Sequence, residues 1–174
     1  QLKVIADIGI VGLPNAGKSS LLAALTKARP KIASYPFTTL DPNLGVAYYD
    51  NKEITLADIP GLVEGAHKGV GLGDKFLRHI ERCKILLHLI DLSEEDLLGN
   101  YKKIRNELSN YDKNLSKKKE IIFFNKSDLF DKKDIDIKIK TFKNKIKSKL
   151  EIISIFSKKD LLKIKKILLK HVSK

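Results

Sequence analysis

The chain has 174 residues, of which 43% are hydrophobic, and this length suits one globular domain with a sizeable core. Its sequence has no apolar run near the roughly 20 residues of a membrane-spanning helix. No secretory segment precedes residue 8, and the one cysteine, Cys83, excludes an internal disulfide and is expected to pack in the core. We expect a cytoplasmic monomer with a single domain over residues 1–174, and the absence of methionine indicates that this domain is excised from a longer chain.

The net charge of +13 is concentrated in the last third of the chain. Residues 1–112 hold 14 basic and 14 acidic side chains, whereas residues 113–174 hold 20 lysines and 7 acids. A basic face of this kind can bind nucleic-acid phosphates with salt-dependent affinity. Lysine-rich composition on solvated helix faces is an equally good explanation, so both interpretations stay open.

A phosphate-binding loop follows the first predicted strand, residues 8–11. Gly12 and, after four residues, Gly17 with the following Lys-Ser pair have the spacing of a P-loop. In such a loop, backbone N–H groups and a helix N-terminus hold phosphate. Lys18 would reach the β- and γ-phosphates, and the Ser19 hydroxyl would ligate Mg²⁺. Residues 20–28 are predicted to form a helix. The nucleotide-binding residues predicted here are Gly12, Leu13, Pro14, Asn15, Ala16, Gly17, Lys18, Ser19 and Ser20.

A long loop without regular period is predicted over residues 31–44, and loops of this length are usually functional. Beside Phe37, either Thr38 or Thr39 can offer a hydroxyl to Mg²⁺ and a backbone N–H to the γ-phosphate. The residues alone do not choose between these two threonines.

A β-hairpin is predicted next, with strands at 45–49 and 53–57 around the turn pair Asp50-Asn51. Its second strand delivers the sequence Asp58-Ile59-Pro60-Gly61 to the edge that carries the P-loop. A carboxylate there holds Mg²⁺, and the Gly61 N–H can approach the γ-phosphate because glycine has no side chain.

The middle of the chain alternates helices and strands. A glycine-rich loop, residues 62–74, carries His67, which we expect to be an exposed loop residue, and a helix is predicted at 74–82. Residues 85–91 form an apolar run typical of a buried parallel strand, with His88 as a core histidine whose hydrogen bonds are satisfied. A helix is predicted at 93–110, then a link at 114–119.

The base-recognition signal follows the strand predicted at 120–124. The Asp128 carboxylate matches the two donors on the Watson–Crick edge of guanine, whereas adenine would leave that carboxylate unpaired. Asn125 can join this loop to the P-loop, and the Lys126 stem can lie along the base. The loop Ser154-Ile155-Phe156 is predicted to lie under the base. A helix at 135–149, a strand at 150–153 and a helix at 158–172 complete the chain.

These motifs, in this order, resemble the Ras-like P-loop GTPases. The resemblance implies an α/β fold with a mostly parallel six-stranded sheet, one antiparallel edge strand and helices on both faces. Within that superfamily the segments GLPNAGKSS, YPFTTLDPNLGV, DIPGLVEGAHKGVGLGDKFLRHIERCKILLHLID and NKSD resemble the Obg family.

The Obg resemblance implies a Mg²⁺-dependent domain that binds GTP and GDP and hydrolyses GTP slowly. It implies two nucleotide-sensitive switch loops, about 31–46 and 58–74, and a role in large ribosomal subunit assembly, with the basic third of the chain facing RNA. It favours Thr39 as the Mg²⁺ ligand and assigns catalysis to Lys18, Thr39 and Gly61.

Three positions refine the resemblance. Leu62 stands where Ras-like proteins usually have a water-orienting glutamine, and Asn15 matches the asparagine that holds K⁺ in potassium-stimulated relatives. Ile155 replaces the alanine usual in the last motif. Two alternatives remain: an RNA- or ribosome-binding module in which hydrolysis is only a timer, and a related P-loop ATPase, against which Asp128 argues.

Overall fold

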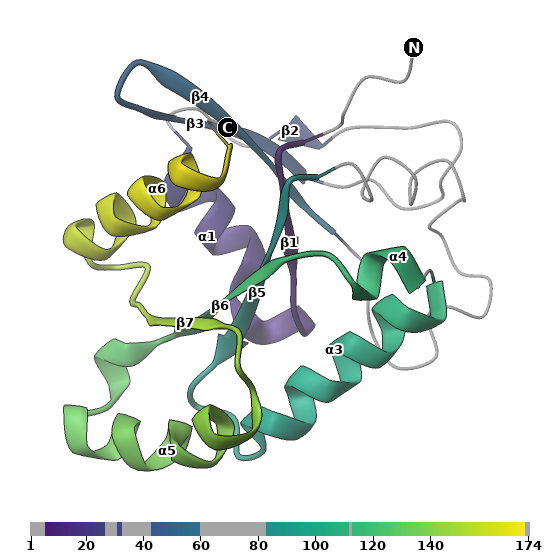
Figure 1. Cartoon of the computed structure of the whole chain (residues 1–174). Coiled ribbons are helices and arrows are strands. Elements are labelled where there is room, and N and C mark those ends of the chain that lie inside the picture. The colour runs from purple at the N-terminus through teal and green to yellow at the C-terminus, as the bar shows by residue number, and fades with distance from the viewer. Residues whose placement is uncertain (1–5, 27–30, 33–42, 60–82, 112, 173–174) are drawn as a thin grey trace.

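The computed structural model describes residues 6–26, 31–32, 43–59, 83–111 and 113–172, which form one mixed β-sheet with helices on both faces (Figure 1). No helix within these ranges is long and apolar enough to cross a membrane. The strands are β1 (Ile8–Val11), β2 (Lys31–Ile32), β3 (Asn43–Tyr49), β4 (Lys52–Asp58), β5 (Ile85–Asp91), β6 (Glu120–Asn125) and β7 (Lys149–Ile152). The helices are η1 (Pro14–Ala16), α1 (Lys18–Leu25), α3 (Leu97–Tyr111), α4 (Lys113–Ser116), η2 (Ser127–Leu129), α5 (Lys132–Lys145) and α6 (Lys158–Val172).

The strands lie in the order β2-β3-β4-β1-β5-β6-β7, and β4, β1, β5, β6 and β7 are parallel. All six strands predicted from the sequence are present, with ends that differ by at most two residues. The two-residue strand β2 adds a seventh and pairs antiparallel with β3. The antiparallel strand β3 is therefore second from the edge, and both ends of the predicted 31–44 loop belong to the sheet.

The β3–β4 hairpin turns through Asp50 and Asn51, whose φ angles are +52° and +58°. Positive φ at both central residues defines the type I′ turn that matches the twist of paired strands, and Asn and Asp tolerate this region well. This local chemistry explains why the turn pair marked the hairpin correctly.

Two apolar layers cover the sheet because side chains alternate along each strand. In β6, Ile121 and Phe123 join the cluster formed with α1 and α6, whereas Ile122 and Phe124 join the cluster formed with α3 and α5. Phe142 of α5 packs edge-on against Phe124, with ring centroids 5.0 Å apart. Figure 1 shows these helix pairs on opposite sides of the sheet.

Four helical segments differ from the sequence prediction, the first being α1, which spans Lys18–Leu25 instead of 20–28. Helix α5 spans Lys132–Lys145 instead of 135–149, because the Asp131 side chain caps it by accepting a hydrogen bond from Asp134 N at 2.8 Å. Helix α3 begins at Leu97 instead of residue 93, and the predicted link at 114–119 contains the one-turn helix α4. The predicted helix 74–82 lies outside the described residues.

Cys83, just before β5, is 1% exposed and packs with Ala6 and Ala57. Burial raises the pKa of its thiol to about 12, with Lys118 opposing that rise. The predicted packing role of this cysteine is therefore confirmed.

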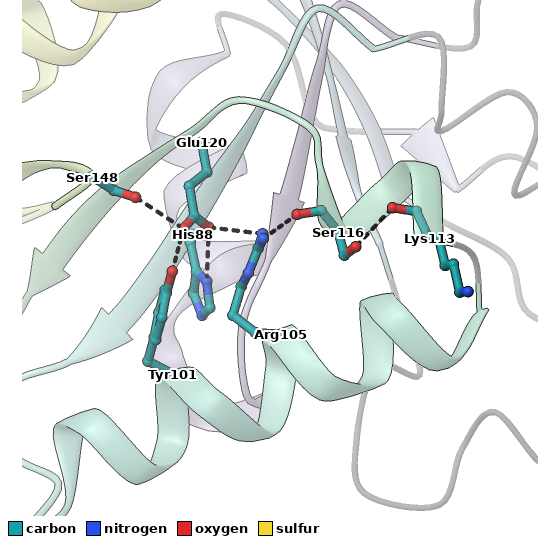
Figure 2. Close-up of polar contacts among 7 residues, drawn as sticks. All are labelled: His88, Tyr101, Arg105, Lys113, Ser116, Glu120 and Ser148. Carbon is teal, nitrogen blue, oxygen red and sulfur yellow. Dashed lines mark hydrogen bonds and ion pairs between the residues drawn. The ribbon is translucent and has the colours of Figure 1, made fainter. Parts of the chain in front are cut away.

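His88 lies in the middle of β5, is buried, and stacks on Tyr101 of α3 with ring centroids 5.0 Å apart. Figure 2 shows that its imidazole faces Glu120, the first residue of β6, and the distance from Nδ1 to Oε2 is 3.5 Å. Tyr101 Oη donates to Glu120 Oε1 at 2.5 Å. The core position predicted for His88 is confirmed, but the predicted satisfaction of its hydrogen bonds is wrong for Nδ1, which makes no well-aligned hydrogen bond with the described residues.

Acid should weaken the fold through His88. Burial holds the pKa of His88 below its ordinary value of about 6.5, although Glu120 opposes this. The unfolded chain therefore binds more protons, and the free energy of unfolding should fall as pH drops below about 6.5, with a slope approaching ~1.4 kcal/mol per pH unit. Urea titrations between pH 7.5 and 5 measure this slope, and His88→Gln should flatten it. An equal slope in the variant would show that other groups cause the acid sensitivity.

Candidate nucleotide-binding site

Parallel strands bring four chemically distinct segments to one edge of the sheet. Ile10 of β1 pairs with Asp58 at the end of β4, and Asp91 at the end of β5 pairs with Asn125 at the end of β6. Ligands bind outside the carboxyl ends of strands in sheets of this kind. The P-loop, Asp58, Asn125 and the loop after β7 therefore share one edge, as the sequence predicts.

The P-loop turns from β1 to α1 through two positions that accept only glycine. Gly17 has φ +99°, in the left-handed region, and a Cβ there would lie 2.7 Å from Asn125 Nδ2. A Cβ on Gly12 would lie 2.5 Å from the carbonyl oxygen of Leu89. Between them Pro14, Asn15 and Ala16 form one 3₁₀ turn, and α1 begins directly after Gly17. This geometry leaves the N-terminus of α1 facing the cleft, where it favours anions.

Lys18, Ser19 and Asp58 meet beside that helix start. Lys18 Nζ lies 3.2 Å from Asp58 Oδ1 and donates to the carbonyl oxygen of Ile59 at 3.1 Å. Ser19 Oγ donates to Asp58 Oδ2 at 3.1 Å. Lys18 and Asp58 are both 7% exposed, so opposite charges share a poorly solvated position. The group therefore joins a cation, a hydroxyl and a carboxylate at one end of the cleft.

The donor set at this end fits Mg²⁺. A hydroxyl and a carboxylate are hard oxygen ligands of the kind that Mg²⁺ prefers. Among the described residues Asp58 Oδ1 accepts no hydrogen bond, although it faces Lys18. The carboxylate therefore retains lone pairs for a metal ion or for its water ligands.

Asn125 ties the end of β6 to the P-loop. Its Nδ2 donates to the carbonyl oxygen of Ala16 at 3.1 Å, and the side chain is 1% exposed. The next residue, Lys126, has φ +72°, a left-handed conformation that is uncommon for a lysine. Its Nζ lies 3.5 Å from the carbonyl oxygen of Asn15. The P-loop and the loop after β6 are therefore joined at two points.

Asp91 anchors Lys126, a role that was not predicted from the sequence. Asp91 Oδ2 lies 2.7 Å from Lys126 Nζ, while Ser93 donates to Oδ1 through its backbone N at 2.8 Å and its Oγ at 2.6 Å. Burial alone would raise the pKa of Asp91, but the contacts with Lys126 and Ser93 outweigh it and lower that pKa. An acid at the end of a predicted strand, as at Asp58, was the available signal.

Replacing Asp91 by Asn should loosen the lysine that it holds. The loss of one partly exposed ion pair corresponds to about 1 kcal/mol, so we expect guanine nucleotide to dissociate about 5-fold faster. Stopped-flow displacement of a fluorescent GDP analogue measures this rate. Ser93→Ala, which removes one hydrogen bond but leaves the ion pair, is the matched control and should have a smaller effect. An unchanged rate in Asp91→Asn would contradict the anchoring role.

At the other end of the cleft, Asp128 is held by the loop after β7. Ser154 Oγ donates to Asp128 Oδ1 at 2.9 Å and accepts from Phe156 N at 3.2 Å. Ser154 N donates to Asp160 Oδ2 at 2.9 Å. Asp160 at the start of α6 thus fixes this loop, a role that was not predicted from the sequence. Phe156 is 81% exposed and lies at the cleft.

One cleft of about 370 Å³ joins the two ends. Most of the predicted binding residues line it, and Leu129 is an additional lining residue with 60% exposure. The predicted lining residues are Pro14, Asn15, Gly17, Lys18, Ser19, Ser20, Asn125, Lys126, Asp128, Ile155 and Phe156. Gly12, Leu13, Ala16, Asp58, Ile59 and Ser154 belong to the supporting segments described above. Phe37, Thr38, Thr39, Pro60 and Gly61 lie outside the described residues, as does most of the sequence predicted to form the two switch loops.

Comparisons with known proteins agree with this geometry. A family model described as a 50S ribosome-binding GTPase matches residues 7–126. GTPase Obg of Pelagibacter ubique is 61% identical over 173 residues, which cover 99% of this chain and 53% of that protein. GTPase Obg of Ehrlichia ruminantium is 56% identical over 174 residues, covering 100% of this chain and 51% of the relative. The chain thus spans about half the length of the curated relatives it matches.

Solved structures share the fold at lower identity. A variant of Era from Aquifex aeolicus bound to GDP and AlF₄⁻ matches with a TM-score of 0.70 and 24% identity, covering 98% of this chain and 57% of that chain. The G domain of the FeoB iron transporter of T. maritima matches with a TM-score of 0.65 and 21% identity, covering 94% of this chain and 96% of that one.

Proposed function

Because this chain belongs to the Obg family of 50S ribosome-binding GTPases, we propose that it binds GTP and GDP and hydrolyses GTP to GDP and phosphate with Mg²⁺. The observation that carries this proposal is the single cleft lined by both Lys18 and Asp128. A cation at one end suits a triphosphate, and an acid at the other suits guanine. The family gives the reaction class, and the cleft supplies a place for both ends of the nucleotide.

The phosphate end supplies charge and donors. The P-loop amides and the N-terminus of α1 would hold the phosphates, while Lys18 turns from Asp58 and Ile59 to the β- and γ-phosphate oxygens. Ser19 and Asp58, with Thr39 from the first switch loop, would hold Mg²⁺ directly or through water. When bound, the metal ion neutralises charge that develops between the β- and γ-phosphates.

The catalytic residues proposed are Lys18, Thr39 and Gly61, the last two acting through backbone N–H groups at the γ-phosphate and, for Thr39, through its hydroxyl at the metal. Residues of about 31–46 and 58–74 would form the two switch loops that respond to that phosphate. Leu62 stands where a glutamine orients water in Ras-like proteins, so intrinsic hydrolysis should be slow.

The base end gives selectivity. Asp128 would accept from the N1 and N2 donors of guanine, Ser154 holds that carboxylate in place, and the Ile155 N–H would meet O6 of the base. Lys126 and Phe156 would cover its faces. Adenine has neither of these two donors, so ATP would leave the Asp128 carboxylate desolvated and unpaired.

Nucleotide competition and hydrolysis test the proposal together. The chain should release phosphate from GTP with Mg²⁺, and EDTA should abolish release. ATP should fail to displace a fluorescent GDP analogue when present at the same concentration as competing GTP. Displacement by ATP would refute the base assignment and favour the ATPase alternative.

A ribosomal role is the second part of the proposal. The matched family is described as ribosome-binding, and residues 113–174 carry a large positive charge. We therefore propose the large ribosomal subunit, or its RNA, as partner, and a cytoplasmic site of action. Hydrolysis rates with and without purified large subunits separate the two versions of this role. Strong stimulation favours an activated GTPase switch, whereas binding without stimulation favours a binding module with hydrolysis as a timer.

Potassium stimulation through Asn15 is a further part of the proposal. Asn15 lines the cleft, where a K⁺ ion held near the phosphates would supply the positive charge that an arginine finger supplies elsewhere. Hydrolysis in KCl should exceed hydrolysis in NaCl at equal ionic strength, and Asn15→Ala should remove the difference. Equal rates in the two salts would refute it.

A further inference from the structure

A second cavity, of about 540 Å³, opens at the edge of the sheet opposite the nucleotide cleft. It lies where β6 and β7 begin: Glu120 starts β6, and Lys149 starts β7 and pairs with Ile121. Strand β6 runs from this cavity to Asn125 at the nucleotide cleft. Five residue steps at about 3.3 Å each separate the two sites by roughly 17 Å along the strand. A ligand here therefore need not compete with nucleotide.

The lining of this cavity is strongly basic. Lys117, Lys119 and Lys149 are exposed at its rim, and the structure gives them no ion pair with another described residue. Arg105 and Lys118 contribute two further positive charges to its wall. Among the described residues of the lining Glu120 is the only acid, so these residues have a net charge of +4 without His171. Concave surfaces with charge of one sign concentrate counter-ions.

Glu120, the acid in the floor of the cavity, already contacts other side chains of the protein. Glu120 is 9% exposed, and Figure 2 shows Tyr101, Arg105 and Ser148 converging on its carboxylate. Ser148 Oγ donates at 3.3 Å, and Arg105 Nη1 lies 3.4 Å away. These contacts neutralise the charge of Glu120 locally. The lysines at the rim therefore remain able to attract an anionic partner. The positive charge available to a partner therefore lies at the mouth of the cavity.

We propose that this cavity, with Lys117, Lys119 and Lys149 at its rim, binds backbone phosphates of RNA. The inference rests on the ribosomal partner proposed above and names the surface that meets it. Arg105 also donates to the carbonyl oxygen of Ser116, and Lys118 donates to that of Cys83 at 2.8 Å, so the forked donor and the inner lysine are held by the protein.

The remaining lysines come from two separate chain segments and act as exposed point charges. Such an arrangement suits a repeating polyanion better than a compact anion, which needs converging donors. The surface would hold RNA through its backbone without reading sequence.

The test uses a fluorescein-labelled 20-nucleotide oligouridylate and fluorescence anisotropy across a KCl series. The rim variant is Lys117→Gln/Lys119→Gln/Lys149→Gln. The control is Lys132→Gln/Lys133→Gln/Lys140→Gln, which removes the same charge from exposed positions of α5. Loss of three phosphate contacts should lower the affinity of the rim variant by at least about 10-fold and reduce its salt slope by about 2, whereas the control should lose far less.

Three outcomes would overturn the inference. Equal losses in both variants would mean that binding follows total charge, and full competition by millimolar inorganic pyrophosphate would indicate a small-anion site. Displacement of the RNA by saturating GDP would place the RNA in the nucleotide cleft. GDP affinity, measured on the same samples, should be unchanged in the rim variant. A chain that binds no GTP but shows the rim effect would refute the nucleotide proposal alone, and the converse result would refute only this inference.

Discussion

Replacing Asp128 by Asn should move nucleotide preference from guanine to xanthine. The asparagine amide presents one donor in place of a carboxylate oxygen, so it faces the N2 amino group of guanine with like polarity but suits the C2 carbonyl of xanthine. Loss of a charged, paired contact corresponds to about 3 kcal/mol, or roughly a 100-fold lower GTP affinity. Competition of GTP and XTP against a fluorescent GDP analogue measures this change of nucleotide preference.

Ser154→Ala is the matched control for that change. It removes the 2.9 Å hydrogen bond to Asp128 and leaves the carboxylate in place. We expect a loss of less than about 10-fold with guanine still preferred, because a single neutral donor corresponds to about 1 kcal/mol. If Asp128→Asn kept its guanine preference, the base would not bind at this carboxylate.

Replacing Lys18 by Ala should nearly abolish triphosphate binding. Its ammonium is the cation at the phosphate end that is 3.2 Å from Asp58, and two charge-assisted contacts to phosphate correspond to about 3 kcal/mol or more. GTP affinity should therefore fall at least about 100-fold, as isothermal calorimetry can measure. The same change leaves the buried Asp58 carboxylate unpaired, so the free energy of unfolding should fall by about 3 kcal/mol.

A double variant separates the two effects. Lys18→Ala/Asp58→Ala removes both members of the buried pair and should recover most of the unfolding free energy measured by urea. GTP binding should stay lost, because neither phosphate nor Mg²⁺ regains its partner. Recovery of GTP binding in the double variant would show that the single change acted only by leaving a buried charge unpaired.

Local chemistry made the strands and the phosphate loop predictable from sequence. The spacing of Gly12 and Gly17 encodes backbone positions that no side chain can occupy, and the Asp50-Asn51 pair supplies the two positive φ angles of the hairpin. The apolar runs of β5 and β6 are continuous because both faces of these strands are covered. Each of these signals lies within a few residues of the feature that it specifies.

The unpredicted features depend on contacts between separate segments or on caps. Asp91 acts on Lys126, 35 residues away, and nothing in the sequence around Asp91 indicates that partner. Asp160 fixes the loop at Ser154 through a hydrogen bond to a backbone N–H, which any residue could supply. Helix α5 begins earlier than predicted because Asp131 caps it, and its lysine-rich first turn has little apolar periodicity from which the start could be recognised. Strand β2 is only two residues long, too short for a period to show.

The burial of Cys83 makes the molecule convenient for site-directed labelling. A thiol with a pKa of about 12 is almost wholly protonated at neutral pH, and at 1% exposure it is also shielded from reagents. Since this is the only cysteine in the 174 residues, a new cysteine placed on the surface would be the one reactive thiol. Maleimide dyes could then be attached at chosen positions on either edge of the sheet without first replacing the native residue.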